Sequence, residues 1–114
     1  INKNKFLQVI HNLFDNFLTY QKKFSKILIS VRIDGKYCII NFVDQGPGIS
    51  IDYKDKIFER FYTDRDLNQK SHSGLGLSIS KKIVESFGGD INLIKSSHIG
   101  FEGACFEIKL PLKE

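Results

Sequence analysis

The chain has 114 residues, of which 41% are hydrophobic and 26% are charged, and its formal net charge is +4. A chain of this length and composition forms one globular domain that buries about two thirds of its unfolded surface. The small positive charge indicates only a weak attraction to anionic ligands, and we expect no nucleic-acid partner. No apolar run in the sequence is long enough to cross a membrane.

The cysteines and the first residue narrow the class of protein further. Cys38 and Cys105 lack the spacing of metal ligands and are too few for a disulfide scaffold, which favours a reducing compartment. The sequence begins with Ile1 rather than Met. We therefore expect residues 1–114 to be a single domain of a longer protein.

An amphipathic helix is predicted for residues 3–20, with Asn2 or Asn4 as its N-cap. Its apolar stripe recurs at helical spacing and consists of Phe6, Val9, Ile10, Leu13, Phe14, Phe17 and Leu18. Asn12 and Asn16 are four residues apart, so they lie on one side of the helix, at the edge of the stripe. Either they bond to neighbouring loops, or they present amide oxygens to a cation such as Mg²⁺ and to phosphates.

A β-hairpin is predicted next. Residues 27–33 alternate in hydropathy as in a half-buried strand, Asp34-Gly35 is a two-residue turn, and residues 37–43 form the return strand. Asp44 ends this strand on the face that also carries Ile40 and Phe42. If that face packs on the helix, the Asp44 carboxylate points into the core layer, where an unpaired charge is costly.

Two glycines and a proline follow Asp44 at once, in the sequence Gly46-Pro47-Gly48. Glycine tolerates positive φ and proline fixes φ, so the backbone turns sharply here. Taken alone, the segment reads as a turn with a solvated Asp. At the end of a strand whose face is buried, it is also suited to hold the flat polar edge of a ligand.

The second half of the chain predicts two helices separated by a polar segment. Residues 52–61 form a short helix that Ser50 or Asp52 caps, and residues 62–73 form either a lid or a plain linker. The next helix opens at Gly74-Leu75-Gly76 and ends before Gly88-Gly89. Glycines at a helix start expose N–H groups to an anion, although glycines also serve close packing.

Two strands complete the pattern, at residues 90–95 and 104–110. In the second strand Ala104, Phe106, Ile108 and Leu110 form the inward face.

Four separated motifs occur in a specific order along the chain. They are Asn12-Leu13-Phe14-Asp15-Asn16, Asp44-x-Gly46-x-Gly48-Ile49, Phe58-Glu59-Arg60-Phe61-Tyr62 and Gly74-Leu75-Gly76-Leu77. They resemble the N, G1, F and G2 boxes of the catalytic, ATP-binding domain of sensor histidine kinases, which belongs to the GHKL superfamily. Gly103-Ala104-Cys105-Phe106, ahead of Leu110-Pro111, resembles the last box of that domain. The resemblance covers nearly the whole chain.

The resemblance implies an α/β fold, a two-layer sandwich of the Bergerat type, with a mixed sheet covered on one face by three helices. It implies that Asp44 accepts a hydrogen bond from the adenine amino group, and that Asn16 ligates Mg²⁺ with Asn12 near the metal or the phosphates. The other nucleotide-binding residues that it implies are Tyr20, Gly46, Gly48, Ile49, Ile57, Arg60, Gly74, Leu75, Gly76 and Leu77.

By the same resemblance, the chain is the catalytic domain of a histidine protein kinase with little activity in isolation. It would bind ATP and Mg²⁺ and donate the γ-phosphoryl group to a histidine on a separate dimerisation domain in two-component signalling. Relatives that hydrolyse ATP carry a Glu where this chain has Asn12, and an amide cannot take a proton from water. The alternative is a degenerate ATP-binding signalling module, because Phe17, Thr19 and His72 depart from the residues usual in the family.

The resemblance also implies partners and a location. A response regulator would act downstream, and the parent protein would be a homodimer anchored in the membrane. This domain would lie on the cytoplasmic side without direct membrane contact.

Overall fold

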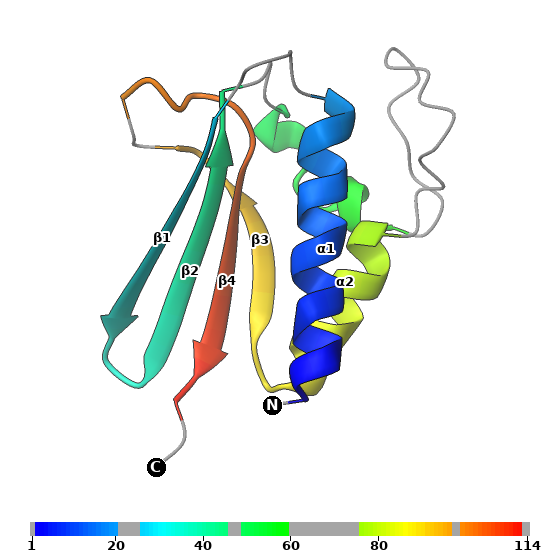
Figure 1. Ribbon diagram of the computed structural model, residues 1–114, viewed down its shortest axis with the longest axis vertical. Helices are drawn as coiled ribbons and strands as arrows, with labels where there is room; N and C mark the ends of the chain where they lie inside the picture. Colours follow the sequence, from blue (N-terminus) through cyan, green and yellow to red (C-terminus); the bar gives the residue numbers. More distant parts are fainter. Residues whose placement is uncertain (1, 21–25, 46–48, 60–75, 97–98, 113–114) are drawn as a thin grey trace.

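The computed structural model describes residues 2–20, 26–45, 49–59, 76–96 and 99–112, and its elements form two layers (Figure 1). One layer is a four-stranded sheet with the strand order β1-β2-β4-β3. The other contains helices α1 (Lys3–Tyr20) and α2 (Gly76–Ser86), which lie side by side against one face of the sheet. The predicted two-layer α/β sandwich is confirmed.

The strands are β1 (Ile27–Asp34), β2 (Tyr37–Asp44), β3 (Asp90–Ile94) and β4 (Cys105–Pro111). Neighbouring strands all pair in the antiparallel sense within the described residues, whereas a mixed sheet was expected. The reason lies in the connections. A parallel pair needs a crossover, and the segment that contains α2 joins β2 to β3, which are separated by β4.

The predicted β1–β2 hairpin is confirmed, but its turn is shifted by one residue. Asp34 pairs with Tyr37, so the two turn residues are Gly35 and Lys36 rather than Asp34 and Gly35. Gly35 has φ +61°, which only glycine adopts without strain, and it therefore takes the first turn position.

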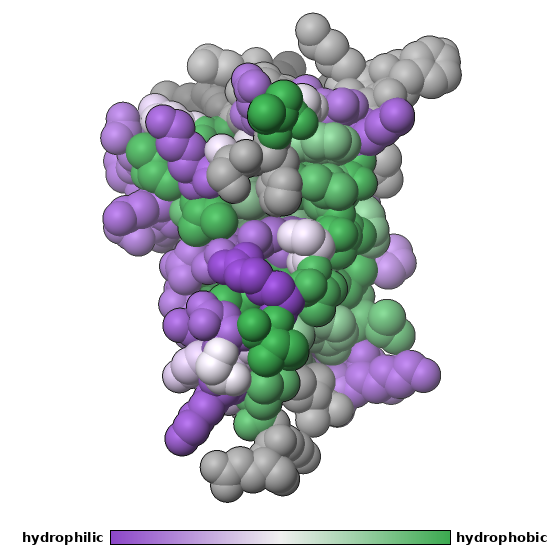
Figure 2. All heavy atoms as spheres, turned by 90° about the vertical axis from the view of Figure 1, so that its left-hand side faces the viewer, coloured by the Kyte–Doolittle hydropathy of each residue, from purple (hydrophilic) through white to green (hydrophobic). Residues whose placement is uncertain are grey.

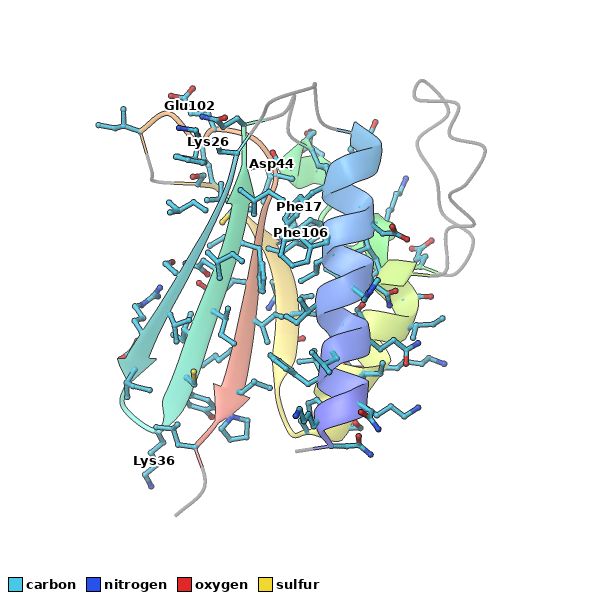
Figure 3. The ribbon with its side chains drawn as sticks, viewed as in Figure 1. Phe17, Lys26, Lys36, Asp44, Glu102 and Phe106 are labelled. Atoms are coloured by element: carbon cyan, nitrogen blue, oxygen red, sulfur yellow. The ribbon has the colours of Figure 1, made fainter. Side chains whose placement is uncertain are left out.

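Helix α1 has the predicted bounds, and the six residues of the predicted stripe whose side chains are described belong to the core or pack partly buried against it. Asn2 caps it, because its Oδ1 accepts a hydrogen bond of 3.1 Å from the Lys5 N–H. Val9, Leu13 and Phe17 are fully buried. The ring centroid of Phe17 lies 6.0 Å from that of Phe106, which projects from β4 toward the helix (Figure 3). These aromatic contacts hold α1 on the centre of the sheet.

The segment predicted as a short helix at 52–61 consists of two 3₁₀ turns, η1 (Ile51–Tyr53) and η2 (Lys56–Phe58). Ser50 caps the first turn, because its Oγ accepts from the Asp52 N–H at 3.3 Å. Two short turns replace one α-helix because so few residues cannot offset the cost of starting a helix. Phe58 is buried and packs edge-on against Phe106, with ring centroids 6.2 Å apart.

Helix α2 ends where the glycine pair predicts. Gly88 has φ +80°, the Gly88 N–H donates to the Glu85 carbonyl, and the Gly89 N–H donates to the Val84 carbonyl. This is the pattern of a left-handed helix C-cap. Neither α2 nor any other described helix is long and apolar enough to cross a membrane.

Both cysteines are free. Cys105 is buried in β4, and burial, together with the negative charges of Glu107 and Asp44, raises the pKa of its thiol to about 11. It is therefore a neutral, packed side chain at physiological pH.

Strand β1 forms one edge of the sheet, and its apolar face is largely uncovered. Ile29, Val31 and Ile33 are 45%, 64% and 62% exposed, although they lie opposite Phe42, Ile40 and Cys38 on the helix side. Apolar side chains form a band when the molecule is viewed from this edge (Figure 2). The expected half-buried strand is thus more exposed than its pattern indicates, because the helices lie over β4 and β3 and not over this edge.

This difference predicts unequal costs for one substitution at two isoleucines of the sheet. Ile108→Ala in β4 should lower the free energy of unfolding by about 2–5 kcal/mol, because the side chain is fully buried. Ile33→Ala in β1 should lower it by less than about 1 kcal/mol, since little packing is lost at an exposed position. Urea denaturation of the two variants checks the prediction. Equal losses would mean that the β1 edge is covered in solution.

Candidate functional site

Asp44 is the best-defined polar group at the end of the sheet where β2 stops (Figure 3). Its side chain is 3% exposed, as its position on the core side predicts. Oδ1 accepts a hydrogen bond of 3.0 Å from the Ala104 N–H, and the Asp44 main chain pairs with Ala104 and Gly103. The carboxylate is therefore held in one orientation. An ionised carboxylate has about four acceptor positions, so it can also bind a ligand N–H group.

Asn16 is the second buried polar group, on the C-terminal half of α1. It is 2% exposed, and no residue in the described part of the chain forms a hydrogen bond with its amide. A buried amide without a partner is uncommon in folded proteins, so it points to a ligand or to a group beyond the described residues. An amide oxygen is a hard ligand of the kind that Mg²⁺ prefers. Asn16 therefore fits a cation site.

Asn12, one turn earlier, joins the two helices. Its Nδ2 donates to the Gly76 carbonyl at 3.2 Å and to Ser80 Oγ at 3.1 Å. These bonds use the amide nitrogen, so only Oδ1 can face a metal ion or take part in its ligation. The Asn12 nitrogen thus bonds a neighbouring element, but that element is helix α2 and not a loop as the first alternative had it.

The remaining predicted residues divide into core and main-chain positions. Ile57 and Leu77 are 6% and 7% exposed and belong to the core, and Ile49 is half-buried against it. Gly76 is the first residue of α2, where main-chain N–H groups are directed outward. Leu77 can therefore contribute to an anion site through its N–H and not through its side chain.

Several predictions lie outside what the structure describes. They are the side chain of Tyr20 and residues Gly46, Gly48, Arg60, Gly74 and Leu75, together with the possible lid at 62–73.

The described site groups lie on neighbouring elements. The C-terminal ends of α1 and β2 lie at the same end of the two layers, and α2 begins beside the middle of α1 (Figure 1), where Asn12 bonds Gly76. The N-terminus of a helix carries a partial positive charge, which favours an anion. A carboxylate, a neutral amide and a positive helix end on neighbouring elements can bind a ligand that has both an amine edge and phosphates.

Phe17 departs from the family pattern but does not enter the site. It is fully buried against Phe106 and belongs to the core. Its size is accommodated between the layers.

Sequence reasoning missed three residues that support the site. The Ala104 N–H donates to the Asp44 carboxylate, and Ser80 Oγ accepts from the Asn12 amide. The Gln45 side chain bonds the main chain of Lys26 and of Gly100. Ser80 follows Gly76 at helical spacing, so helix periodicity would have found it once α2 was placed beside α1. The contact of Ala104 needs the register of β2 against β4, which the sequence does not specify.

The comparisons with known proteins identify the family of the chain. The family model for histidine kinase-, DNA gyrase B- and HSP90-like ATPases matches residues 1–114. The sensor protein ChvG of Agrobacterium fabrum is 37% identical over 113 residues, which cover 94% of this chain and 19% of that protein. The signal transduction histidine-protein kinase BaeS of Escherichia coli is 36% identical over 98% of this chain and 24% of that protein.

Solved structures give the same result for the fold. A mycobacterial sensor histidine kinase, MprB, superposes with a TM-score of 0.86 at 26% identity, over 97% of this chain and 74% of that one. The catalytic domain of histidine kinase ThkA superposes with a TM-score of 0.79 at 28% identity, over 97% and 69% of the two chains. The chain spans less than a quarter of the length of ChvG and BaeS. Because the family model matches residues 1–114, the chain belongs to the family of histidine kinase-, DNA gyrase B- and HSP90-like ATPases, and its relatives are sensor histidine kinases.

Proposed function

We propose that this domain binds Mg-ATP and donates the γ-phosphoryl group to a histidine on a separate dimerisation domain of its parent protein. The observation that carries the proposal is the buried Asp44 carboxylate, which the Ala104 N–H fixes at the end of the sheet where Asn16 is also buried. A fixed acceptor suits the amino group of adenine. A neutral amide oxygen suits a hard cation on the phosphates.

The nucleotide would lie between α1, the turn after β2 and the start of α2. Asp44 would accept from the adenine amino group, and the N–H groups at the start of α2 would bind phosphate oxygens. The other residues that we assign to nucleotide binding are Tyr20, Gly46, Gly48, Ile49, Ile57, Arg60, Gly74, Leu75, Gly76 and Leu77.

Asn16, with the oxygen of Asn12 nearby, would hold Mg²⁺. When bound, the ion would neutralise negative charge on the phosphoryl group during transfer. The chain itself positions the phosphates and need not supply a base, because a neutral histidine side chain is already a nucleophile. Asn12 cannot act as a base toward water, and its nitrogen is engaged with Gly76 and Ser80, so hydrolysis should be slow.

A degenerate module that binds ATP without transferring phosphate is the second candidate. Thr19 and His72 favour it, since both differ from the residues usual in the family. Phe17 no longer does, because it is packed in the core. Transfer of phosphate to an acceptor histidine separates the two candidates.

Titration with a fluorescent ATP analogue, with and without Mg²⁺, tests nucleotide binding. We expect saturable binding that ATP displaces and GTP does not, and a lower affinity when EDTA removes Mg²⁺. Binding that is absent, or equal for ATP and GTP, would contradict the proposed role of Asp44.

In the parent protein, we propose that this domain acts on the cytoplasmic side of a membrane-anchored homodimer. A response regulator would then receive the phosphoryl group from the histidine.

A further inference from the structure

The loop between β3 and β4 holds Asp44 through its main chain and through one carboxylate oxygen. The Gly103 N–H donates to the Asp44 carbonyl at 3.0 Å, and the Asp44 N–H donates to the Ala104 carbonyl at 3.2 Å. The Ala104 N–H donates to Asp44 Oδ1 at 3.0 Å. The orientation of the carboxylate therefore depends on where this loop places the Ala104 N–H.

Gln45 fixes the same loop from the other side. Its Nε2 donates to the Gly100 carbonyl at 3.1 Å, and its Oε1 accepts from the Lys26 N–H at 2.8 Å. The side chain thus links the loop to the start of β1. Only a side chain with both a donor and an acceptor at its end can make both bonds, and glutamine has both.

The geometry of the loop makes this link effective. Gly100 has φ +83°, so its carbonyl is presented from a turn that glycine alone adopts without strain. Ser96 Oγ donates to the Phe101 carbonyl at 2.6 Å and closes the loop internally. Residues 99–103, bonded at Gly100, Phe101 and Gly103, have little freedom to move the Ala104 N–H away from Asp44.

We propose that Gln45 is a positioning residue for nucleotide binding, which acts through the β3–β4 loop to fix the Asp44 carboxylate before ATP arrives. The inference rests on the proposed role of Asp44 toward adenine. Gln45 itself is exposed, and its side chain bonds the main-chain atoms of Lys26 and Gly100. Without them, part of the binding energy would go into ordering the loop.

The test compares three variants with the wild-type domain. Gln45→Ala removes both bonds, and Gln45→Glu keeps the acceptor for the Lys26 N–H but cannot donate to Gly100. Gly100→Ala strains the turn from the far side of the link and meets no atom within 4 Å of the added Cβ. Each variant should lower the affinity for the ATP analogue by about three- to tenfold, which is the effect of losing a neutral hydrogen bond. Ile99→Ala is the control, because this side chain in the same loop is 97% exposed and should change nothing.

Two further readouts separate positioning from a direct contact with the nucleotide. Hydrogen exchange of the Ala104 N–H, measured without nucleotide, should be faster in all three variants and unchanged in Ile99→Ala. The double variant Gln45→Ala/Gly100→Ala should bind the ATP analogue no more weakly than the single variant with the lower affinity, because both substitutions disrupt the same link.

Unchanged Ala104 exchange in Gln45→Ala, or fully additive losses in the double variant, would overturn the inference. If the wild-type domain does not bind ATP, the proposed function is wrong, whatever the role of Gln45 in the loop. The exchange experiment still decides whether Gln45 orders the loop, because it needs no nucleotide.

Discussion

Asp44→Asn should weaken ATP binding about ten- to a hundredfold, since losing one hydrogen bond to a charged group costs about 1.5–3 kcal/mol. The amide would place an N–H₂ group where the carboxylate accepts from the adenine amino group. The Asn oxygen can still accept from the Ala104 N–H, which holds Asp44 at 3.0 Å, so the domain should remain folded. Displacement of a fluorescent ATP analogue measures the loss.

Two controls make this result specific to the base. GTP carries an acceptor where ATP carries the amino group, so it has no bond to the Asp44 carboxylate to lose, and its weak binding should not fall in Asp44→Asn. Asp34→Asn removes a carboxylate at the opposite end of β1, where the side chain is exposed, and should leave ATP affinity unchanged. Equal losses for ATP and GTP would show that Asp44 supports the fold and does not select adenine.

Asn16→Ala should abolish phosphoryl transfer to an acceptor histidine. The variant removes the buried amide oxygen that we assign to Mg²⁺, while Asn12 keeps its bonds to Gly76 and Ser80. The free energy of unfolding should change by less than about 1 kcal/mol, because no described residue loses a hydrogen bond. Radiolabelled ATP and an added acceptor domain give the measurement.

The matched control is Asn4→Ala, an exposed asparagine on the same helix. It should transfer phosphate at the wild-type rate. In addition, Mg²⁺ should raise the affinity of Asn4→Ala for ATP but not that of Asn16→Ala. Transfer by Asn16→Ala at the wild-type rate would exclude this residue from the metal site.

The elements that local patterns control were predictable from the sequence. The stripe of α1, the glycines after α2 and the inward face of β4 each depend on neighbouring residues, and all three are found where predicted. The core-side position of Asp44 followed from strand alternation in β2. These features need no knowledge of which strand lies beside which.

The features that depend on long-range placement were not predictable. The exposure of Ile29, Val31 and Ile33 arises because the helices leave the β1 edge of the sheet uncovered, and alternation within the strand does not reveal that. The donation from Asn12 to Gly76 joins residues 64 positions apart, and the bond from Ala104 to Asp44 joins residues 60 apart. A periodic pattern places a residue on a face of its own element, but the partner depends on how the elements pack.

We propose that this domain donates phosphate to histidine and not to water. The most direct test measures phosphate release and acid-labile phosphoprotein formation in one reaction, with Mg-ATP and the dimerisation domain of the parent protein supplied separately. We predict that the domain alone releases phosphate slowly, because a general base for water, worth about 10²–10⁴-fold, is replaced by the neutral amide of Asn12. Addition of the acceptor domain should then yield an acid-labile, base-stable phosphoprotein. Rapid phosphate release by the domain alone, without labelling of an acceptor histidine, would contradict the claim and assign the chain to a hydrolytic branch of its family.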